Sequence, residues 1–252
     1  NDGSIPTTAA SADVIITGNA GNDYFGWALA AGDMNADSKI DLVVSAKGYS
    51  TNTGRTYIFY NDGSIPTTAA TADVTITGNA TSDEFGISLA TGDTNADGKT
   101  DLIVGASGHS SFTGRVYIFN NDGSIPTTAA TADVTITGNA TGDRFGHSVV
   151  TGDLNSDGRD DLAVGAWNYS SITGRVYIFH NDGSIPTTAA TADVTITGAA
   201  TNNYFGYSLA TGDLNSDGRV DLLVGARGDF ELSEIGRAYI FYNDGSIPTT
   251  AG

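Results

Sequence analysis

The sequence predicts an all-β protein built from four copies of one unit, and three observations support this. The string Asn-Asp-Gly-Ser-Ile-Pro-Thr-Thr-Ala begins at positions 1, 61, 121, 181 and 243. Each copy holds four short apolar runs, and none has the spacing of a long amphipathic helix. The chain contains 33 glycines and 5 prolines, a balance that suits many short strands joined by tight turns.

The second copy shows how each unit divides into strands. Phe85–Ala90 is the first run, and a polar loop separates it from Asp101–Ala106, an unbroken apolar run that suits a strand covered on both faces. Gly114–Phe119 is β-branched and aromatic, and Val134–Thr137 alternates apolar and polar residues, as a half-buried outer strand does. Four strands per unit, repeated radially, are typical of a β-propeller blade. We therefore predict a β-propeller with four four-stranded blades per chain.

The repeats predict a single propeller domain over residues 1–252. Its units are 1–60, 61–120, 121–180 and 181–242, and 243–252 begins a further repeat. The outer strand Val14–Thr17 precedes the first complete unit, whereas the last blade, 205–241, lacks an outer strand. We expect Val14–Thr17 to close the last blade and hide its edge; the alternative is that this segment frays, as termini often do.

The size of the ring is open to three interpretations. The chain can form a four-bladed monomer, or half of an eight-bladed homodimer in which each N-terminal strand completes the other chain's last blade. Such an exchange is a low-cost route to a symmetric dimer. The third interpretation is a part of a longer array. We favour the eight-bladed homodimer.

An acidic loop separates the first two strands of every unit, with oxygen-bearing side chains at loop positions 1, 3, 5 and 9. Ca²⁺ takes about six to eight oxygen ligands in irregular geometry, and the backbone carbonyl at position 7 can add a fifth. We predict one Ca²⁺ per blade, four per chain; the alternative is an Asx-rich turn without metal. The predicted ligands, with Lys and Arg contributing only carbonyls, are Asp33, Asn35, Asp37, Lys39 and Asp41; Asp93, Asn95, Asp97, Lys99 and Asp101; Asp153, Asn155, Asp157, Arg159 and Asp161; and Asp213, Asn215, Asp217, Arg219 and Asp221.

The first loop departs from the other three at position 6. Ser38 stands where the other loops have Gly98, Gly158 and Gly218. If this position requires a positive φ, serine is strained there and glycine is not. We expect the first loop to bind calcium more weakly.

The overall charge restricts the possible partners. The chain has 11 basic and 29 acidic residues and a net charge of −18, which argues against nucleic acid and against anionic membranes. It has no cysteine and therefore no disulfide framework. No apolar run approaches the length of a membrane span. The chain begins at Asn1 without a visible signal peptide, so we expect a processed chain or a piece of a longer protein.

Two dipeptides make the pattern more specific. Phe-Gly occurs at 25, 85, 145 and 205, and Gly-Ala occurs at 105, 165 and 225, with the acidic loop between them; the first copy has Ser45-Ala46 instead of Gly-Ala. Over essentially the whole chain this resembles FG-GAP repeats, which build the propellers of integrin α subunits and of many bacterial surface proteins. The resemblance implies calcium in the acidic loops on the lower face, an extracellular or cell-surface location, and usually seven blades.

Variation among the four copies gathers in two loops per unit, one before Phe-Gly and one between the second and third strands. Alternating strand directions place both loops on the rim opposite the acidic loops. Exposed aromatic residues on such a rim suit protein partners or sugars, and the alternative is drift in surface loops. The candidate ligand-binding residues are Tyr24, Tyr49, His109, Phe112, Trp167, Tyr169, Tyr204 and Phe230.

No catalytic constellation is visible, because His109, His147 and His180 occupy unrelated repeat positions and no nucleophile or phosphate-loop motif is present. We therefore predict a protein that is not an enzyme. The favoured function is a calcium-stabilised extracellular adhesion or scaffolding propeller that binds a protein partner through its variable loop face. The alternatives are a calcium-dependent lectin, since some fungal lectins resemble this fold, and a non-catalytic domain of a secreted hydrolase.

Overall fold

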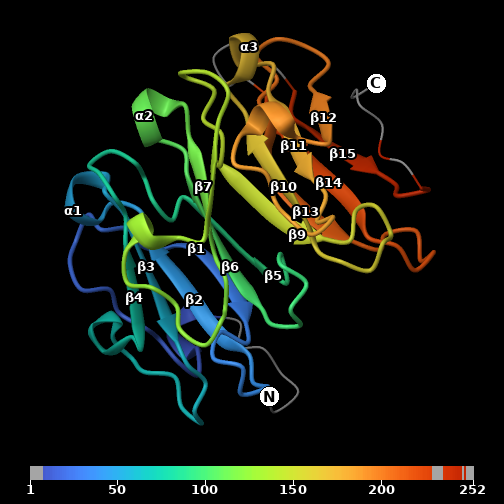
Figure 1. Ribbon diagram of the computed structural model, residues 1–252. Helices are drawn as coiled ribbons and strands as arrows, with labels where there is room; N and C mark the ends of the chain where they lie inside the picture. The colour runs from blue at the N-terminus through green and yellow to red at the C-terminus, as the bar shows by residue number, and fades with distance from the viewer. Residues whose placement is uncertain (1–7, 229–234, 246, 248–252) are drawn as a thin grey trace.

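A computed structural model describes residues 8–228, 235–245 and 247, which form four antiparallel sheets arranged side by side (Figure 1). Each sheet is one blade, and its strands lie in chain order from the inside outwards. Blade one contains β1 (Phe25–Gly32), β2 (Asp41–Ala46), β3 (Arg55–Phe59) and β4 (Val74–Thr77). Blade two contains β5 (Ser88–Gly92), β6 (Asp101–Ala106), β7 (Arg115–Phe119) and β8 (Val134–Thr137). Blade three contains β9 (Ser148–Gly152), β10 (Asp161–Ala166), β11 (Arg175–Phe179) and β12 (Val194–Thr197), and blade four contains β13 (Phe205–Gly212), β14 (Asp221–Ala226) and β15 (Arg237–Phe241).

This arrangement confirms the predicted all-β propeller with four blades per chain. Short helical turns, which the apolar pattern did not indicate, complete the connections. The turns α1 (Tyr49–Asn52), α2 (His109–Phe112) and α3 (Tyr169–Ile172) join second to third strands, and the 3₁₀ turns are η1 (Ala9–Ser11), η2 (Ala69–Thr71), η3 (Ala129–Thr131) and η4 (Ala189–Thr191). In the described part of the chain, no helix combines the length and apolar character needed to cross a bilayer.

The phenylalanine of each Phe-Gly pair fills the upper half of its blade. In blade two the Phe85 ring meets the Tyr117 and Phe119 rings edge-on, at centroid distances of 5.4 and 6.3 Å. All three rings are buried, and edge-to-face pairs of this kind add to the gain from burial. The same aromatic trio recurs in the other blades, so the dipeptide marks a packing site.

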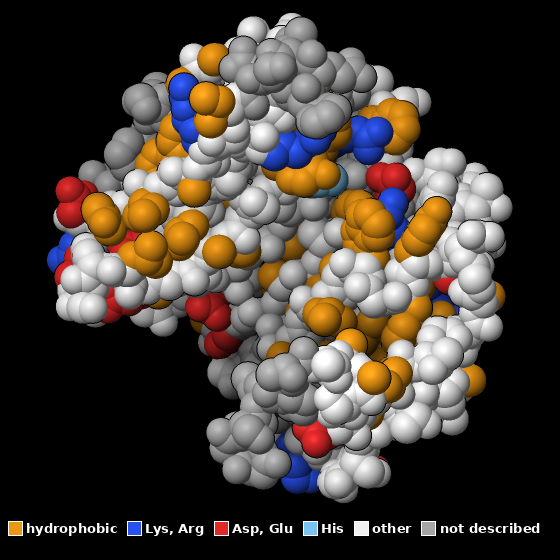
Figure 2. Space-filling view, turned by 180° about the vertical axis from the view of Figure 1, so that it is seen from behind, with side chains coloured by type: hydrophobic (Ala, Val, Ile, Leu, Met, Phe, Trp, Pro, Cys, Tyr) orange, Lys and Arg blue, Asp and Glu red, His pale blue; other side chains and the backbone are white. Residues whose placement is uncertain are grey.

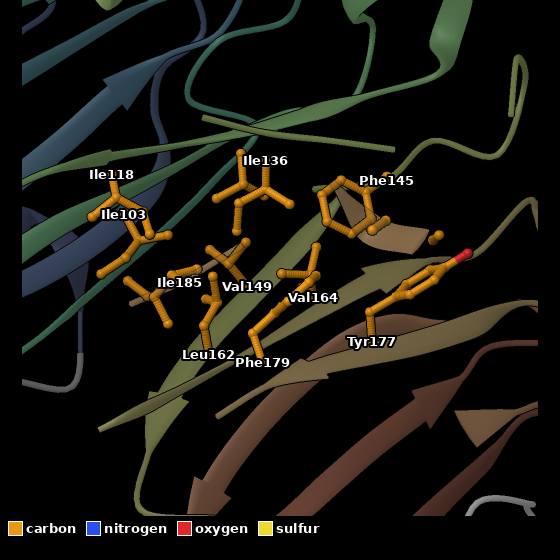
Figure 3. Close-up of a cluster of buried hydrophobic side chains, with 14 residues drawn as sticks. Ile103, Ile118, Ile136, Phe145, Val149, Leu162, Val164, Tyr177, Phe179 and Ile185 are labelled. Carbon is orange, nitrogen blue, oxygen red and sulfur yellow. The ribbon is translucent and has the colours of Figure 1, made fainter. Parts of the chain in front are cut away.

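Neighbouring blades share a continuous apolar seam. Between blades two and three, Ile103 and Ile118 face Val149 on the inner strand β9 (Figure 3). Polar links flank this seam, since the Ser88 hydroxyl donates to the Gly146 carbonyl at 2.9 Å. Blades two and three therefore bury both faces against their neighbours, and each end blade buries one.

The arc of four blades does not close on itself. The inner strands pack in the order β1, β5, β9, β13, but no comparable contact joins β13 back to β1, and the space-filling outline is notched on one side (Figure 2). Within the described residues β15 pairs only with β14. The expectation that Val14–Thr17 closes the last blade is thus not met within one chain. Thr17 forms an isolated parallel bridge with Thr68 instead.

Candidate metal loops and upper rim

The acidic loops lie where predicted, between the first and second strands of each blade. In blade two the Asp97 amide donates to Asp93 Oδ1 at 3.0 Å and to Asn95 Oδ1 at 2.9 Å, so oxygens from loop positions 1 and 3 meet at one N–H. Asp93 Oδ2 accepts from the Gly98 amide at 2.8 Å, and Asp97 Oδ1 accepts from the Lys99 amide at 2.9 Å. The other three loops repeat these contacts. The side chains at positions 1, 3 and 5 are therefore drawn inwards by backbone amides.

The carboxylate at position 9 has a different place, beneath the loop and fully buried. Asp101 Oδ1 accepts from the Asn121 amide at 2.9 Å, while Asp101 Oδ2 accepts from the amide and hydroxyl of Thr94 at 2.9 and 2.7 Å. Burial raises the pKa of Asp101, and the N–H donors oppose this shift. Each position-9 carboxylate consequently ties its loop to the end of the third strand.

The loops contain the chemistry of a calcium site but do not converge as one. Their donors are carboxylate, amide and carbonyl oxygens, the hard ligands that Ca²⁺ prefers. Yet nowhere in the described residues do three or more Asp, Glu, His or Cys side chains gather as they would around an ion. The donor types fit calcium, and the ligand assignment stays a prediction.

Three of the four side chains at position 7 contact nearby acceptors. Lys39 Nζ lies 3.3 Å from Asp37 Oδ2, and the Lys39 amide and ammonium group lower the pKa of the exposed Asp37. Arg159 donates to the Asn181 carbonyl at 3.2 Å, and Arg219 makes the same contact with Asn243 at 3.3 Å. These basic side chains are not ion ligands; the only possible ligand at position 7 is the backbone carbonyl of the same residue.

Position 6 of the loops requires the left-handed backbone region that the glycines indicated. Gly98, Gly158 and Gly218 have φ of 82°, 86° and 85°, and Ser38 has φ of 67°. Serine therefore occupies a conformation that costs an L-residue free energy and costs glycine little. The first loop differs from the others in backbone strain, as expected.

A cluster of aromatic and basic side chains lies at the opposite ends of the inner strands, on the upper rim. In blades three and four the Trp167 and Tyr204 rings stack at 5.0 Å with an interplanar angle of 20°. The Arg227 guanidinium lies 4.0 Å from the Tyr204 ring centroid, and that of Arg144 lies 5.4 Å from the Trp167 centroid. We call the whole set the rim cluster; it comprises Tyr24, Trp27, Lys47, Glu84, Arg144, His147, Trp167, Tyr204, Tyr207 and Arg227.

Contacts of charged side chains extend the rim cluster through the first two blades. Lys47 lies 4.1 Å from the Trp27 ring centroid. Glu84 stands between two cations, 3.8 Å from Lys47 and 3.5 Å from Arg144. Hydrophobic side chains and Lys or Arg side chains gather together on this face (Figure 2). The cluster therefore reaches across all four blades.

Two buried donors or acceptors within the rim cluster lack partners. His147 Nδ1 and Trp167 Nε1 are inaccessible and form no hydrogen bond among the described residues. Burial, together with the charges of Arg144, Lys47 and Arg227, lowers the pKa of His147 to about 4. His147 is thus a neutral ring near pH 7, 4.7 Å from the Tyr207 ring.

The structure divides the predicted ligand-binding residues into two groups. Tyr24, Trp167 and Tyr204 lie in the rim cluster, as predicted for a loop face opposite the acidic loops. Of the remaining described candidates, Phe112 borders the rim cluster through Arg144, and the others make contacts outside it. Tyr49 and Tyr169 each lie under an arginine, His109 Nδ1 is 3.2 Å from Asp83, and Phe112 lies under Arg144. Phe230 lies outside the described residues.

Sequence reasoning missed the charged members of the rim cluster and the three residues that follow Phe-Gly. Trp27, His147 and Tyr207 directly follow Phe-Gly, and Lys47 and Arg227 follow the second strand. Both positions differ among the four copies, so comparing copies column by column indicates them. The candidates were chosen as aromatic residues in two variable loops, so the cations were not selected.

Comparisons with known proteins agree with this architecture. A model described as FG-GAP repeat matches residues 25–59 and 85–119, and a model described as FG-GAP-like repeat matches residues 153–224. Integrin alpha-PS2 of Drosophila melanogaster is 32% identical over 223 residues, which cover 81% of this chain and 15% of that protein. Human phosphatidylinositol-glycan-specific phospholipase D is 31% identical over 223 residues, covering 80% of this chain and 26% of that protein.

A third relative, integrin alpha-5 of Xenopus laevis, is 30% identical over 233 residues, covering 87% of this chain and 21% of that protein. The chain thus spans about a quarter or less of the length of these relatives. Matches to the repeat models fall in all four blades and include all four acidic loops. The chain belongs to the FG-GAP repeat family.

Proposed function

We propose that this chain is a calcium-stabilised extracellular adhesion or scaffolding propeller that binds a protein partner through the rim cluster. The observation that carries the proposal is the continuity of the rim cluster across four blades, from the Lys47–Trp27 contact to the Arg227–Tyr204 contact. Aromatic and arginine side chains are the types enriched in protein interfaces. The relatives named integrin alpha support the adhesion part.

Calcium is proposed to hold the lower face of each blade. Loop positions 1, 3 and 5 already direct their oxygens inwards, and an ion there would offset the repulsion between aspartates such as Asp93 and Asp97. We propose four ions per chain, with the loop that contains Ser38 binding most weakly. Binding to the native state alone stabilises a fold by mass action. Cytosolic calcium is too low to fill weak sites, which supports an extracellular or cell-surface location.

Binding is tested on chips carrying the protein in calcium, with a panel of purified extracellular-matrix proteins and a panel of glycans. Trp167→Ala removes the stacked ring of the rim cluster, and Tyr169→Ala serves as the matched control on the outer loops. Saturable binding of a protein that falls at least about tenfold with Trp167→Ala, and not with Tyr169→Ala, supports the proposal. Protein binding that both variants share equally contradicts the rim cluster as the site.

The second candidate function is a calcium-dependent lectin. It is favoured by the stacked aromatic pair Trp167 and Tyr204 beside the guanidinium of Arg227, because sugars combine apolar faces with hydroxyl groups. Saturable glycan binding that Trp167→Ala abolishes would select it. A non-catalytic domain of a secreted hydrolase is the third candidate, supported by the relative named as a phospholipase D; for this chain we propose no catalytic role.

The functional unit we propose is one propeller domain over residues 1–252, paired with a second copy as a homodimer. The support for pairing is the open arc, in which β13 and β1 do not meet. A ring built from two chains would also double the rim cluster and present it twice to a partner, which increases avidity.

A further inference from the structure

The outer face of blade four exposes a residue that every other blade buries. Ile240 on β15 is 46% exposed, whereas its counterparts in the other blades are at most 1% exposed: Ile58, Ile118 and Ile178. Ile118 belongs to the buried cluster that contains Val149 of the next blade (Figure 3). Ile240 therefore has the place of a seam residue but lacks the blade that should cover it.

Blade one exposes the matching residue on its opposite face. Leu29 on β1 is 63% exposed, whereas its counterparts Leu89 and Val149 are 9% and 5% exposed. Leu89 packs in the cluster that contains Ile58 of the preceding blade. Leu29 and Ile240 are the counterparts of Leu89 and Ile58, so Leu29 would pack against Ile240 if blade one followed blade four. The two ends of the arc are two halves of one seam.

The two ends of the arc also carry a matching hydrogen-bond donor and acceptor. Ser88 and Ser148 donate to the carbonyls of Gly146 and Gly206 in the following blade, at 2.9 and 2.8 Å. Ser208 is the counterpart in blade four, and it is exposed with no acceptor among the described residues. The carbonyl that matches Gly146 and Gly206 for a blade after blade four belongs to Gly26.

A glycine in blade four shows the same missing neighbour. A Cβ added at Gly105 or Gly165 would lie 2.0 or 2.1 Å from a carbonyl of the next blade, so the backbones of neighbouring blades approach closely there; in the first copy the buried Ser45 takes this position. At Gly225 the added Cβ would meet only atoms of Ser208 of its own blade. A Cβ at Gly26 would meet nothing within 4 Å. Gly225 thus lacks the close backbone neighbour from a following blade that Gly105 and Gly165 have.

The N-terminal segment is held where the outer strand of a preceding blade belongs. Thr17 bridges to Thr68 in parallel, as Thr77 of β4 bridges to Thr128. However, β4 also pairs with β3 of its own blade, and Val14–Thr17 has no strand on that side. Val14 and Ile15 are about half exposed, at 47% and 55%. The segment is an outer strand without its blade.

We infer that a second copy of this chain completes the ring, with blade four of each copy packed on blade one of the other. This inference rests on the homodimer of the proposed function and specifies its interface. The described residues of one chain do not supply the contact, because β1 and β13 do not meet. A two-fold axis makes both new seams identical and gives blade four of each copy a fourth, outer strand. Eight blades then form one ring.

The repeat fixes the register of the exchanged strand. In blade one Ile58 pairs with Val74, Tyr57 with Thr75 and Thr56 with Ile76. Transferred to the new seam, the antiparallel pairs between β15 of one copy and the N-terminal segment of the other are Ile240 with Val14, Tyr239 with Ile15 and Ala238 with Ile16.

The same transfer predicts one further hydrogen bond and the loss of another. The side chains of Asn121, Asn181 and Asn243 donate to a loop carbonyl of the preceding blade, so Asn61 donates to the Asp213 carbonyl of the second copy. One link is lost, since Ala31 replaces the hydroxyl that Thr91 donates to the Ala31 carbonyl in the first seam. The new seam therefore has one hydrogen bond fewer than the seams between blades two and three and between blades three and four.

The register is tested by cysteine cross-linking, because the chain has no cysteine of its own. Ile16→Cys with Ala238→Cys places both thiols on one face of the paired strands. Ile15→Cys with Ala238→Cys is the matched control, since neighbouring residues in a strand point to opposite faces. After mild oxidation in calcium, the first variant runs near twice the 25.8 kDa chain mass on a non-reducing gel, and the control does not. Equal cross-linking of both variants, or of neither, overturns the register.

The ring is tested by light scattering of the wild-type chain, which gives a mass near twice 25.8 kDa. Ile240→Asp shifts this species towards a monomer, because the new seam would bury the added carboxylate against Leu29 of the second copy, whereas a single chain leaves position 240 half exposed. The monomer it yields stays folded by circular dichroism. A monomeric wild type, an intrachain cross-link or open-ended polymers would overturn the closed two-copy ring. The calcium and partner assays read different quantities, so either proposal can fail without the other.

Discussion

The Asn121 backbone amide donates a 2.9 Å hydrogen bond to the fully buried carboxylate of Asp101. This contact joins the end of an acidic loop to the end of the third strand, and it recurs in all four blades at 2.8 to 2.9 Å. Position 9 of the loop is thus a structural tie in the protein itself, whatever its role towards an ion.

We predict that Asp101→Ala destabilises the native state by about 3 kcal/mol in excess EGTA, because two backbone amides and a hydroxyl lose a buried acceptor. Asp101→Asn retains one acceptor oxygen and loses less. Urea unfolding followed by circular dichroism gives both values. Asp97→Asn, at an exposed position of the same loop, is the control, with a change of under about 0.5 kcal/mol. Equal losses for Asp101→Ala and Asp97→Asn would refute the tie.

Ser38→Gly is predicted to tighten the first loop. Ser38 has φ of 67°, so glycine relieves strain in the native state, although it also makes the unfolded chain more flexible. The net gain in stability is about 0.5 kcal/mol. In a calorimetric calcium titration, Ser38→Gly should raise the affinity of the weakest site towards that of the other three. The reverse change, Gly98→Ser, weakens one strong site, and a titration indifferent to both variants would rule out strain as the cause.

Stability is predicted to fall with acidity because of His147. Burial and nearby cations lower its pKa to about 4 in the native state, whereas an unfolded histidine titrates near about 6.5. Between these values the unfolded state binds more protons, so stability decreases as pH falls through that window. This one group accounts for about 2 kcal/mol between about pH 7 and about pH 5.

His147→Phe isolates this contribution, because it keeps a ring beside Trp167 and Tyr207 and removes the titration. Both proteins are unfolded with urea in EGTA at the two pH values. The variant should lose about 2 kcal/mol less than the wild type over the same interval. Buried carboxylates such as Asp143, whose pKa burial raises, are common to both proteins and cancel. Identical pH dependence would mean that His147 charges freely in the fold.

Phe145→Leu is predicted to cost about 1–2 kcal/mol, through lost burial and two lost edge-on contacts, to Tyr177 at 5.4 Å and Phe179 at 6.3 Å. Phe112→Leu on the upper rim is the matched control, because Phe112 is 40% exposed. Thermal unfolding compares the two variants. If the change at Phe112 were as costly as that at Phe145, the phenylalanine of Phe-Gly would have no special packing role.

Periodicity sufficed to predict the blades, because each strand is short and its apolar pattern is repeated in register. The repeats also indicated that Ser38 occupies a position of positive φ. Periodicity could not show that Val14–Thr17 fails to reach β15, since ring closure depends on the angle between blades and not on any one residue. It also could not show that the Asp101 oxygens accept hydrogen bonds from backbone amides. An aspartate at position 9 suits both this role and the ligation of an ion, so the sequence does not distinguish them.

The rim cluster was only partly predictable for a related reason. Tyr204 and Trp167 stood out as aromatic residues in variable loops. Lys47 and Arg144 form the cluster with them only because the blades bring separate loops together around Glu84. Contacts across blades follow from the ring geometry, which the order of residues in one loop does not specify.

Thermal unfolding of the wild-type chain in millimolar calcium and in excess EGTA tests the calcium-stabilised scaffold most directly. Native-state binding predicts a higher melting temperature in calcium, with a stabilisation of about 4 kcal/mol when free ion is about a thousandfold above the dissociation constant. Asn95→Ala combined with Asp97→Ala should reduce that difference by removing one site. A melting temperature that is the same in calcium and in EGTA would contradict the account.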